Sequence, residues 1–306
     1  MSRLPVAARQ LALGAGASLF GKLPDELDFV RIQHSFAESI LLDRFLQAAL
    51  QRLAARGTRW PDTRLAFVIG GTSGQALVGV LSASRDRARR QYPLAIYARV
   101  PLLDGHSAAL PLACERFVGQ VGELSARSQT LPLAQLSAEL RRLRPPTLRD
   151  VTEANEQLTR ELERSVPKVG AALYPGAQEP AAALHDAFTQ LGASHAPDGS
   201  PIDGFACPAA TTRDVSVWAA ALEQSRAGAT CCSALWQPDT TERVLIAAGP
   251  LPERALLYTA QPNTKHPRLR RLDLTDPLAA AHSGDDSSVS ALLHQLAHSR
   301  SPLRRP

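Results

Sequence analysis

The chain has 306 residues, 44% of them hydrophobic but only 5% aromatic, so its core must be built mainly from Leu, Ala and Val. This length exceeds an average domain but suits a single large α/β domain with extensions. The net charge of +5 is modest and the basic clusters lack interleaved aromatic residues, which argues against a nucleic-acid-binding protein. No run approaches the roughly 18 apolar residues that a spanning helix needs, so we expect no membrane insertion.

The cysteine pattern bears on the compartment. Four cysteines are present, at positions 114, 207, 231 and 232. None forms a C-x-x-C pair, and the adjacent Cys231 and Cys232 are poorly placed to bridge each other without strain. A reducing compartment fits this pattern, and we predict a cytoplasmic protein. A short apolar run at 11–20 has some character of a signal peptide, but Pro5 and Arg9 break its front.

The first half of the chain predicts a helix among short strands. Residues 1–16 form a leader, and a first strand covers 17–23. A helix follows from Phe36 to Leu53, with Ile40 and Leu42 on its broad apolar face and Leu41 and Phe45 on the other side. Three apolar runs with short connections then predict antiparallel neighbours, at 64–69, 76–81 and 93–100.

The second half predicts mostly helices. They fall at 109–125, 133–143, 151–163, 214–225 and 252–259. A strand pair is expected at 231–236 and 243–248. A Pro/Ala/Gly-rich insertion at about 167–211, with one helix at 180–190, interrupts a domain of 17–260. A basic, Pro/Ser-rich, flexible tail at 261–306 follows it. The predicted class is α+β, with a mixed, largely antiparallel central sheet flanked by helices on both sides.

Two strand ends carry dense polar loops, which is where binding residues tend to lie. The first loop and the following helix contribute Gly21, Lys22, Pro24, Asp28, Phe29, Arg31 and Asp43. The second loop contributes Ser84, Asp86, Arg87 and Arg90. Asp86 could bond the backbone of its own loop, and Arg90 could pair with Asp28 or Asp43 to hold the two loops together. An arginine fork also suits recognition of a carboxylate or phosphate, so both interpretations stay open.

No pattern indicates catalysis, a metal or a cofactor. Residues 70–74 (GGTSG) lack the Gly-Lys-Ser/Thr ending of a phosphate-binding loop and fit a hairpin turn. His294 and His298 have the spacing of a metal pair, but no third ligand is nearby. We therefore predict a protein without catalytic residues, metal or cofactor.

The order of motifs resembles the TagF family, which is associated with bacterial type VI secretion systems. The resemblance rests on Gly-Lys-Leu-Pro at 21–24, Asp-Phe-Val-Arg at 28–31, Leu-Asp-x-aromatic-Leu-Gln at 42–47, and Ser-x-Asp-Arg with Arg-x-aromatic-Pro-Leu at 84–94. It covers residues 17–103 well and 212–260 loosely. It implies a cytoplasmic, non-enzymatic accessory protein that represses secretion after translation. The implied partner is the forkhead-associated scaffold protein of the apparatus, and indirectly its Ser/Thr kinase and phosphatase.

Three positions depart from the family pattern. The family usually has Gly before Asp28, often has Pro before Ser84, and commonly has Gly before Arg90. This chain has Leu27, Ala83 and Arg89 there. We expect loops without left-handed backbone, and hence an altered partner specificity in a divergent member. The alternatives are a phosphate- or small-molecule-binding enzyme domain that uses Asp28, Asp86 and Arg90, or a structural subunit of the apparatus.

Overall fold

A computed structural model describes most of the chain between residues 10 and 271. The described residues are 10–11, 16–33, 37–71, 74–103, 106–173, 203–209, 211–225, 231–239, 243–262, 264 and 266–271. Several predictions lie outside them: most of the leader, the helix at 180–190, most of the tail and the His294–His298 pair.

The described elements are ten strands and seven helices. The strands are β1 (Gln10–Leu11), β2 (Ser18–Gly21), β3 (Val30–Ile32), β4 (Leu65–Gly70), β5 (Gln75–Ser82), β6 (Leu94–Pro101), β7 (Gly204–Pro208), β8 (Cys232–Trp236), β9 (Arg243–Ala248) and β10 (Leu269–Arg271). The helices are α1 (Ala37–Ala55), α2 (Leu110–Ala113), α3 (Glu115–Arg127), α4 (Leu133–Arg142), α5 (Leu148–Leu173), α7 (Thr212–Ser225) and α8 (Ala255–Ala260).

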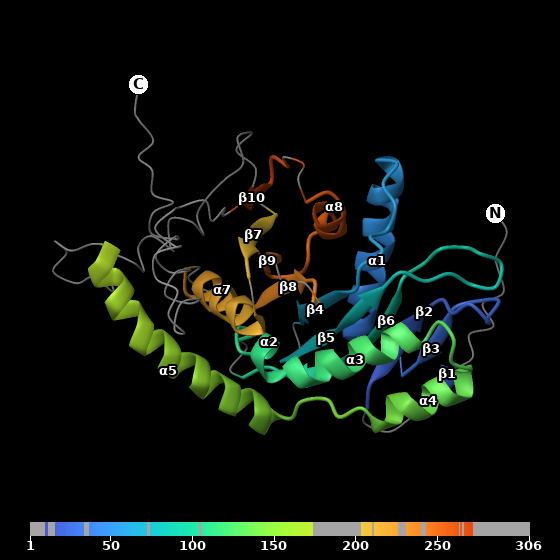
Figure 1. Ribbon diagram of the computed structural model, residues 1–306, viewed down its shortest axis with the longest axis horizontal. Coiled ribbons are helices and arrows are strands. Elements are labelled where there is room, and N and C mark those ends of the chain that lie inside the picture. The colour runs from blue at the N-terminus through green and yellow to red at the C-terminus, as the bar shows by residue number, and fades with distance from the viewer. Residues whose placement is uncertain are drawn as a thin grey trace.

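The described strands form one sheet in the order β1-β3-β2-β6-β5-β4-β8-β9-β7-β10 (Figure 1). The outermost pairs, β1 with β3 and β7 with β10, are parallel, and all the pairs between them are antiparallel. The predicted mixed, largely antiparallel sheet is therefore confirmed. Short connections such as residues 71–74 between β4 and β5 permit this pairing.

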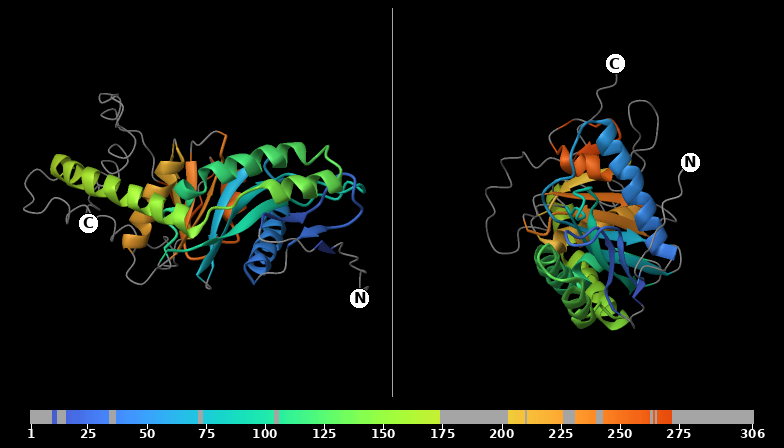
Figure 2. Two further views of the ribbon diagram at one scale, coloured as in Figure 1. Left: turned by 90° about the horizontal axis from the view of Figure 1, so that it is seen from below. Right: turned by 90° about the vertical axis from the view of Figure 1, so that its right-hand side faces the viewer.

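Helices cover both faces of the sheet, as predicted (Figure 2). Along β6, Leu94, Ile96 and Ala98 pack with α3, α4, α5 and α7 in one buried cluster. The alternate residues Ala95 and Tyr97 pack with α1 and α8 in another. Successive side chains of a strand point to opposite faces, so the central strands are covered on both sides and read as nearly continuous apolar runs.

The buried face of α1 differs in part from the prediction. Leu42, Leu46 and Leu53 are buried as expected. Of the two apolar residues placed on the other side, Phe45 is buried and Leu41 is 39% exposed. Ile40 was placed on the buried face, but it is 53% exposed. The cause is its place on the helix: Ile40 lies four and seven residues before the exposed Arg44 and Gln47 and so shares their solvent face, whereas the neighbouring Ser39 is fully buried.

Three strands lie within segments that the sequence analysis placed outside the core. β1 falls within the leader, 1–16, where it pairs with β3. β7 falls within 167–211, where it pairs with β9, and β10 falls within 261–306, where it pairs with β7. Most of the remainder of these three segments lies outside the described residues, so the predicted division into leader, domain, insertion and tail stays a prediction. No helix in the described part of the chain is long and apolar enough to cross a membrane.

A buried carboxylate joins α7 to the sheet. Glu223 accepts hydrogen bonds from the Ser107 amide (2.8 Å) and hydroxyl (2.7 Å), and from the Cys232 amide at 3.2 Å. Ser107 follows β6 and Cys232 begins β8, so one side chain connects three elements that are far apart in sequence. All four cysteines are free thiols, as expected from their spacing.

Candidate functional site

The first loop begins where β2 ends, at a glycine that the backbone requires. Gly21 has φ +139°, a value that residues with a side chain rarely adopt. A Cβ atom there would lie 2.2 Å from the carbonyl oxygen of Pro93. Gly21 therefore lets the start of the first loop pass directly against the end of the second.

Asp86 lies at the centre of the two loops. Its carboxylate accepts hydrogen bonds from Lys22 Nζ at 2.8 Å, from Arg90 Nε at 2.6 Å and from the Arg90 amide at 2.8 Å. The side chain of Asp86 is completely buried and that of Lys22 is 7% exposed. Burial acts to raise the pKa of Asp86, but the bonds from Lys22 and Arg90 outweigh it and lower the pKa from 3.8 to about 2. A carboxylate held ionised in this way suits a structural anchor and is poorly matched to proton transfer near neutral pH.

The second loop is a tight hairpin closed by the same aspartate. The Asp86 amide donates to the carbonyl of Arg90 at 3.1 Å, and the Arg89 amide donates to the carbonyl of Asp86 at 2.8 Å. Arg85 and Gln91 form an antiparallel bridge outside them. Hairpins with a three-residue loop commonly place a left-handed residue at the third position, and Arg89 has φ +61°. The expectation that these loops avoid left-handed backbone is wrong, because closure of the hairpin imposes it on Arg89.

Backbone contacts fix the two loops against each other. The Arg87 amide donates to the carbonyl of Glu26 at 2.9 Å, and Arg90 Nη2 donates to the carbonyl of Leu27 at 2.5 Å. The Ser84 hydroxyl donates to the carbonyl of Lys22 at 2.6 Å. Several carbonyls of the first loop are thus satisfied by the second, and the two loops form one rigid unit.

An aromatic cluster of Phe20, Phe29 and Tyr92 packs against this unit. The rings of Phe29 and Tyr92 lie edge to face, with 4.7 Å between their centres, and the ring of Phe29 stacks on that of Phe20, with 5.7 Å between the centres. Lys22 Nζ lies 5.2 Å from the centre of the Phe29 ring, and the Arg31 guanidinium lies 5.5 Å from the Phe20 ring. Both cations are close enough for a favourable cation–π interaction.

Asp43 connects helix α1 to this cluster. It accepts hydrogen bonds from the Tyr92 hydroxyl at 3.1 Å and from Gln47 Nε2 at 3.0 Å. Burial, and secondarily the negative charge of Asp43, raises the pKa of Tyr92 well above its usual value, so the phenol stays protonated as the donor.

Most of the residues chosen from the sequence do meet in this unit. Asp86 bonds the backbone of its own loop, as predicted. The pairing proposed for Arg90 with Asp28 or Asp43 is wrong, because Arg90 is only four residues from Asp86 and binds it within the hairpin. Asp28 accepts the amide of Phe29 at 2.8 Å instead. Pro24 lies in the turn closed by the Glu26 amide and the Leu23 carbonyl at 3.1 Å.

The sequence analysis did not select Tyr92, Leu27 or Arg89 as site residues. Tyr92 could have been found, since it occupies the aromatic position of the second motif. Leu27 acts through its carbonyl, for which a sequence carries no signal. The need for a left-handed residue at Arg89 becomes visible only once the hairpin is known to close at Asp86 and Arg90.

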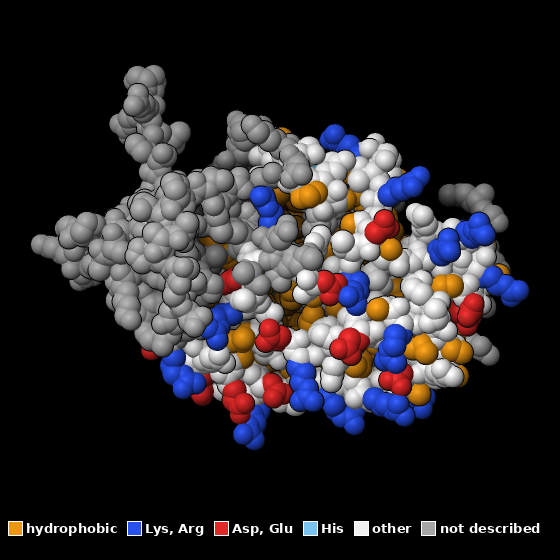
Figure 3. Space-filling model, viewed as in Figure 1, with side chains coloured by type: hydrophobic (Ala, Val, Ile, Leu, Met, Phe, Trp, Pro, Cys, Tyr) orange, Lys and Arg blue, Asp and Glu red, His pale blue; other side chains and the backbone are white. Residues whose placement is uncertain are grey.

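Basic side chains surround the loops on the outside. Arg85, Arg87 and Arg89 are exposed, and no ion-pair partner of theirs is found among the described residues. Leu27, also exposed at 62%, lies in the adjoining loop. In Figure 3, basic side chains gather at the right of the molecule, where the hairpin lies, whereas acidic and basic side chains are interspersed along the lower edge. The outer surface of the unit is therefore cationic with an apolar element.

Comparison with known proteins gives this arrangement a family. Residues 18–143 match the model of the TagF N-terminal domain, described as type VI secretion system-associated. That span runs from β2 to the end of α4 and includes both loops. The chain is thus a type VI secretion system-associated protein. Its residues 18–143 form a TagF N-terminal domain.

Two further comparisons add no function. No curated protein matches the chain. Among solved structures, the chain is similar to PA0076 from Pseudomonas aeruginosa PAO1, at 15% identity and a TM-score of 0.46. That likeness covers 82% of this chain and 96% of the other. It is too distant to carry an inference.

Proposed function

We propose that this protein is a non-enzymatic, cytoplasmic accessory protein that represses assembly of the type VI secretion system after translation. It acts by binding the forkhead-associated scaffold protein of the apparatus, in a setting governed by the Ser/Thr kinase and phosphatase of that system. Membership of a type VI secretion system-associated family supports the setting. The regulatory role and the partner follow from the resemblance to TagF.

One observation carries the binding role: the buried Lys22–Asp86–Arg90 cluster fixes a hairpin whose outer side chains are exposed cations. Holding the backbone rigid lowers the conformational entropy that binding must remove. The side chains of Arg85, Arg87 and Arg89 are exposed on this fixed hairpin and have no ion-pair partner among the described residues. Guanidinium groups recognise carboxylates and phosphates with paired hydrogen bonds, so the surface suits an acidic or phosphorylated partner.

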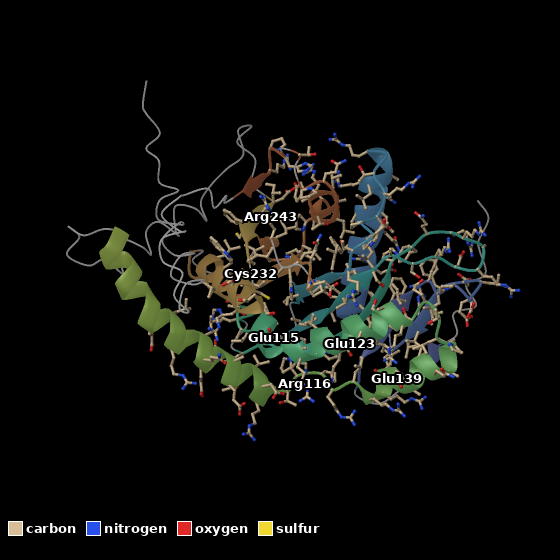
Figure 4. All side chains as sticks on the ribbon, in the orientation of Figure 1. Glu115, Arg116, Glu123, Glu139, Cys232 and Arg243 are labelled. Carbon is tan, nitrogen blue, oxygen red and sulfur yellow. The ribbon has the colours of Figure 1, made fainter. Side chains whose placement is uncertain are left out.

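The test is capture of the scaffold protein from the same gene cluster, both phosphorylated and unphosphorylated, by the full chain. Arg87→Glu reverses an exposed charge, since only the backbone amide of Arg87 contributes to the loop contacts. We expect it to weaken capture at least 10-fold. Arg116→Glu, on α3, is the matched control and should bind like the unmodified chain (Figure 4).

Arg90→Ala tests whether binding depends on the fixed shape of the loops as well as on the exposed charges. It removes one partner of Asp86 and the bond to the Leu27 carbonyl, so it should weaken capture and also lower thermal stability. Capture that is unaffected by Arg87→Glu would contradict recognition through the hairpin. Absence of capture in every phosphorylation state would refute the proposed partner, and a stable, stoichiometric place in the assembled apparatus would favour the structural-subunit alternative.

A further inference from the structure

Beside the two loops lies a groove that the motifs do not account for. It has a volume of about 620 Å³, within the range of about 300–1,000 Å³ typical of ligand sites. Leu50 and Leu53 of α1 form one wall, the segment 58–62 forms a second, and the hairpin residues Tyr92 and Pro93 form a third. All of its lining residues lie in the described part of the chain and within the family domain.

Trp60 gives this groove a polar feature. Its ring lines the groove, and its indole Nε1 is buried with no hydrogen-bond acceptor among the described residues. A buried donor without an acceptor costs about 1–3 kcal/mol. An occupant that carries a carbonyl group, such as a peptide backbone, would relieve that cost once the ring turns toward it.

The charge at the rim selects the occupant. Arg59 and Arg85 line the groove and are exposed, and neither has an ion-pair partner among the described residues. Asp62 is the one acidic residue that lines the groove. A segment that offers acidic side chains to the two arginines and apolar ones to Leu50 and Ala54 complements both the charge and the surface.

We propose that this groove docks an extended acidic peptide segment of the protein partner, with apolar side chains between the acidic ones. The inference deepens the proposed function and rests on it for the source of the segment. The groove and the outer face of the hairpin share Arg85, so one partner can engage both.

The first experiment uses a short synthetic peptide of alternating glutamate and leucine, titrated into the full chain while tryptophan fluorescence is recorded. Of the three tryptophans, Trp218 and Trp236 are buried in the core, so a change on binding reports chiefly on Trp60. We expect a saturable change that weakens at least 10-fold in the Arg59→Glu/Arg85→Glu variant and persists in Arg116→Glu. Trp60→Phe keeps an aromatic ring without the donor, and it should weaken binding measured by calorimetry.

Three results would overturn the groove proposal. These are the absence of a saturable change, an equal change in the double variant, and an equal change with a peptide of alternating lysine and leucine. Capture of the scaffold protein separates this proposal from the proposed function. Normal capture by the double variant overturns the groove and leaves the proposed function standing, whereas specific peptide binding without any scaffold capture supports the groove and refutes the proposed partner.

Discussion

The buried pair of Lys22 and Asp86 allows a quantitative test of how the two loops are held. In Asp86→Asn the side chain keeps its shape but loses its charge, and the Lys22 ammonium, 7% exposed, is left without its counter-ion. Removing one partner of a buried pair typically costs about 3–5 kcal/mol. Because Arg90 approaches from an exposed position and remains partly solvated, we expect the lower end of that range, about 3 kcal/mol in the free energy of unfolding.

The pH dependence gives an independent measure of the same pair. The pKa of Asp86 is depressed from 3.8 to about 2 in the folded protein, so its stabilising contribution is complete above about pH 5 and is lost as the pH falls toward 2. A shift of this size corresponds to about 2 kcal/mol, and partial screening of Arg90 by water reduces our expectation to about 1–2 kcal/mol. About half of that contribution should be gone by pH 3.

The assay is urea unfolding of the full chain at a series of pH values from 7 to 3. The difference between the unmodified chain and Asp86→Asn should shrink by about 0.5–1 kcal/mol between pH 6 and pH 3. Asp25→Asn, at an exposed position of the first loop, serves as the control and should change neither the stability nor its slope. A difference that stays constant with pH would refute the idea that a depressed Asp86 pKa stabilises the fold.

Three further substitutions test other parts of the structure by thermal or urea unfolding. Arg89→Gly should stabilise the chain by about 0.5–1 kcal/mol because glycine adopts positive φ without strain, whereas Ala88→Gly in the same loop should not; a loss of stability in Arg89→Gly would contradict the left-handed assignment. Gly21→Ala should destabilise by more than about 2 kcal/mol, since its Cβ would meet the Pro93 carbonyl, and an unchanged melting temperature would rule out that close approach. Glu223→Ala should cost about 1–3 kcal/mol by leaving the Ser107 amide unpaired, whereas the Cys232 amide keeps its bond to the Ser107 hydroxyl, and faster hydrogen exchange at the Ser107 amide should accompany it.

The order of the central elements followed from the sequence because local patterns decided it. The apolar runs of β4, β5 and β6 are separated by connections too short for a helical crossover, and that alone implies antiparallel pairing. The helices α3, α4 and α5 carry apolar residues at helical spacing, a local pattern that can be recognised without knowing the rest of the fold. The sequence therefore sufficed for the class of fold and for the middle of the sheet.

The outer strands depended on long-range contacts and could not be predicted. β3 is only Val30–Ile32, and it is a strand because β2 lies beside it. β7 and β10 pair with each other although they lie far apart in the sequence, and no local sequence pattern indicates that pairing. The same limit applied to the site: the loops were recognised from their residue types, but Arg90 was matched to the wrong aspartate because its partner depends on how the hairpin closes.

The pairing of β4 with β8 bears on how the chain can be divided. Ala66, Phe67 and Val68 align with Trp236, Leu235 and Ala234, so the sheet runs without interruption from the family domain into the C-terminal half. A fragment that ended at residue 143 would expose the hydrogen-bonding edge of β4, a central strand rich in apolar residues. Such an edge is a template for strands of other molecules. The boundary of the family match is therefore not a folding boundary, and the two halves must find each other before either is protected from self-association.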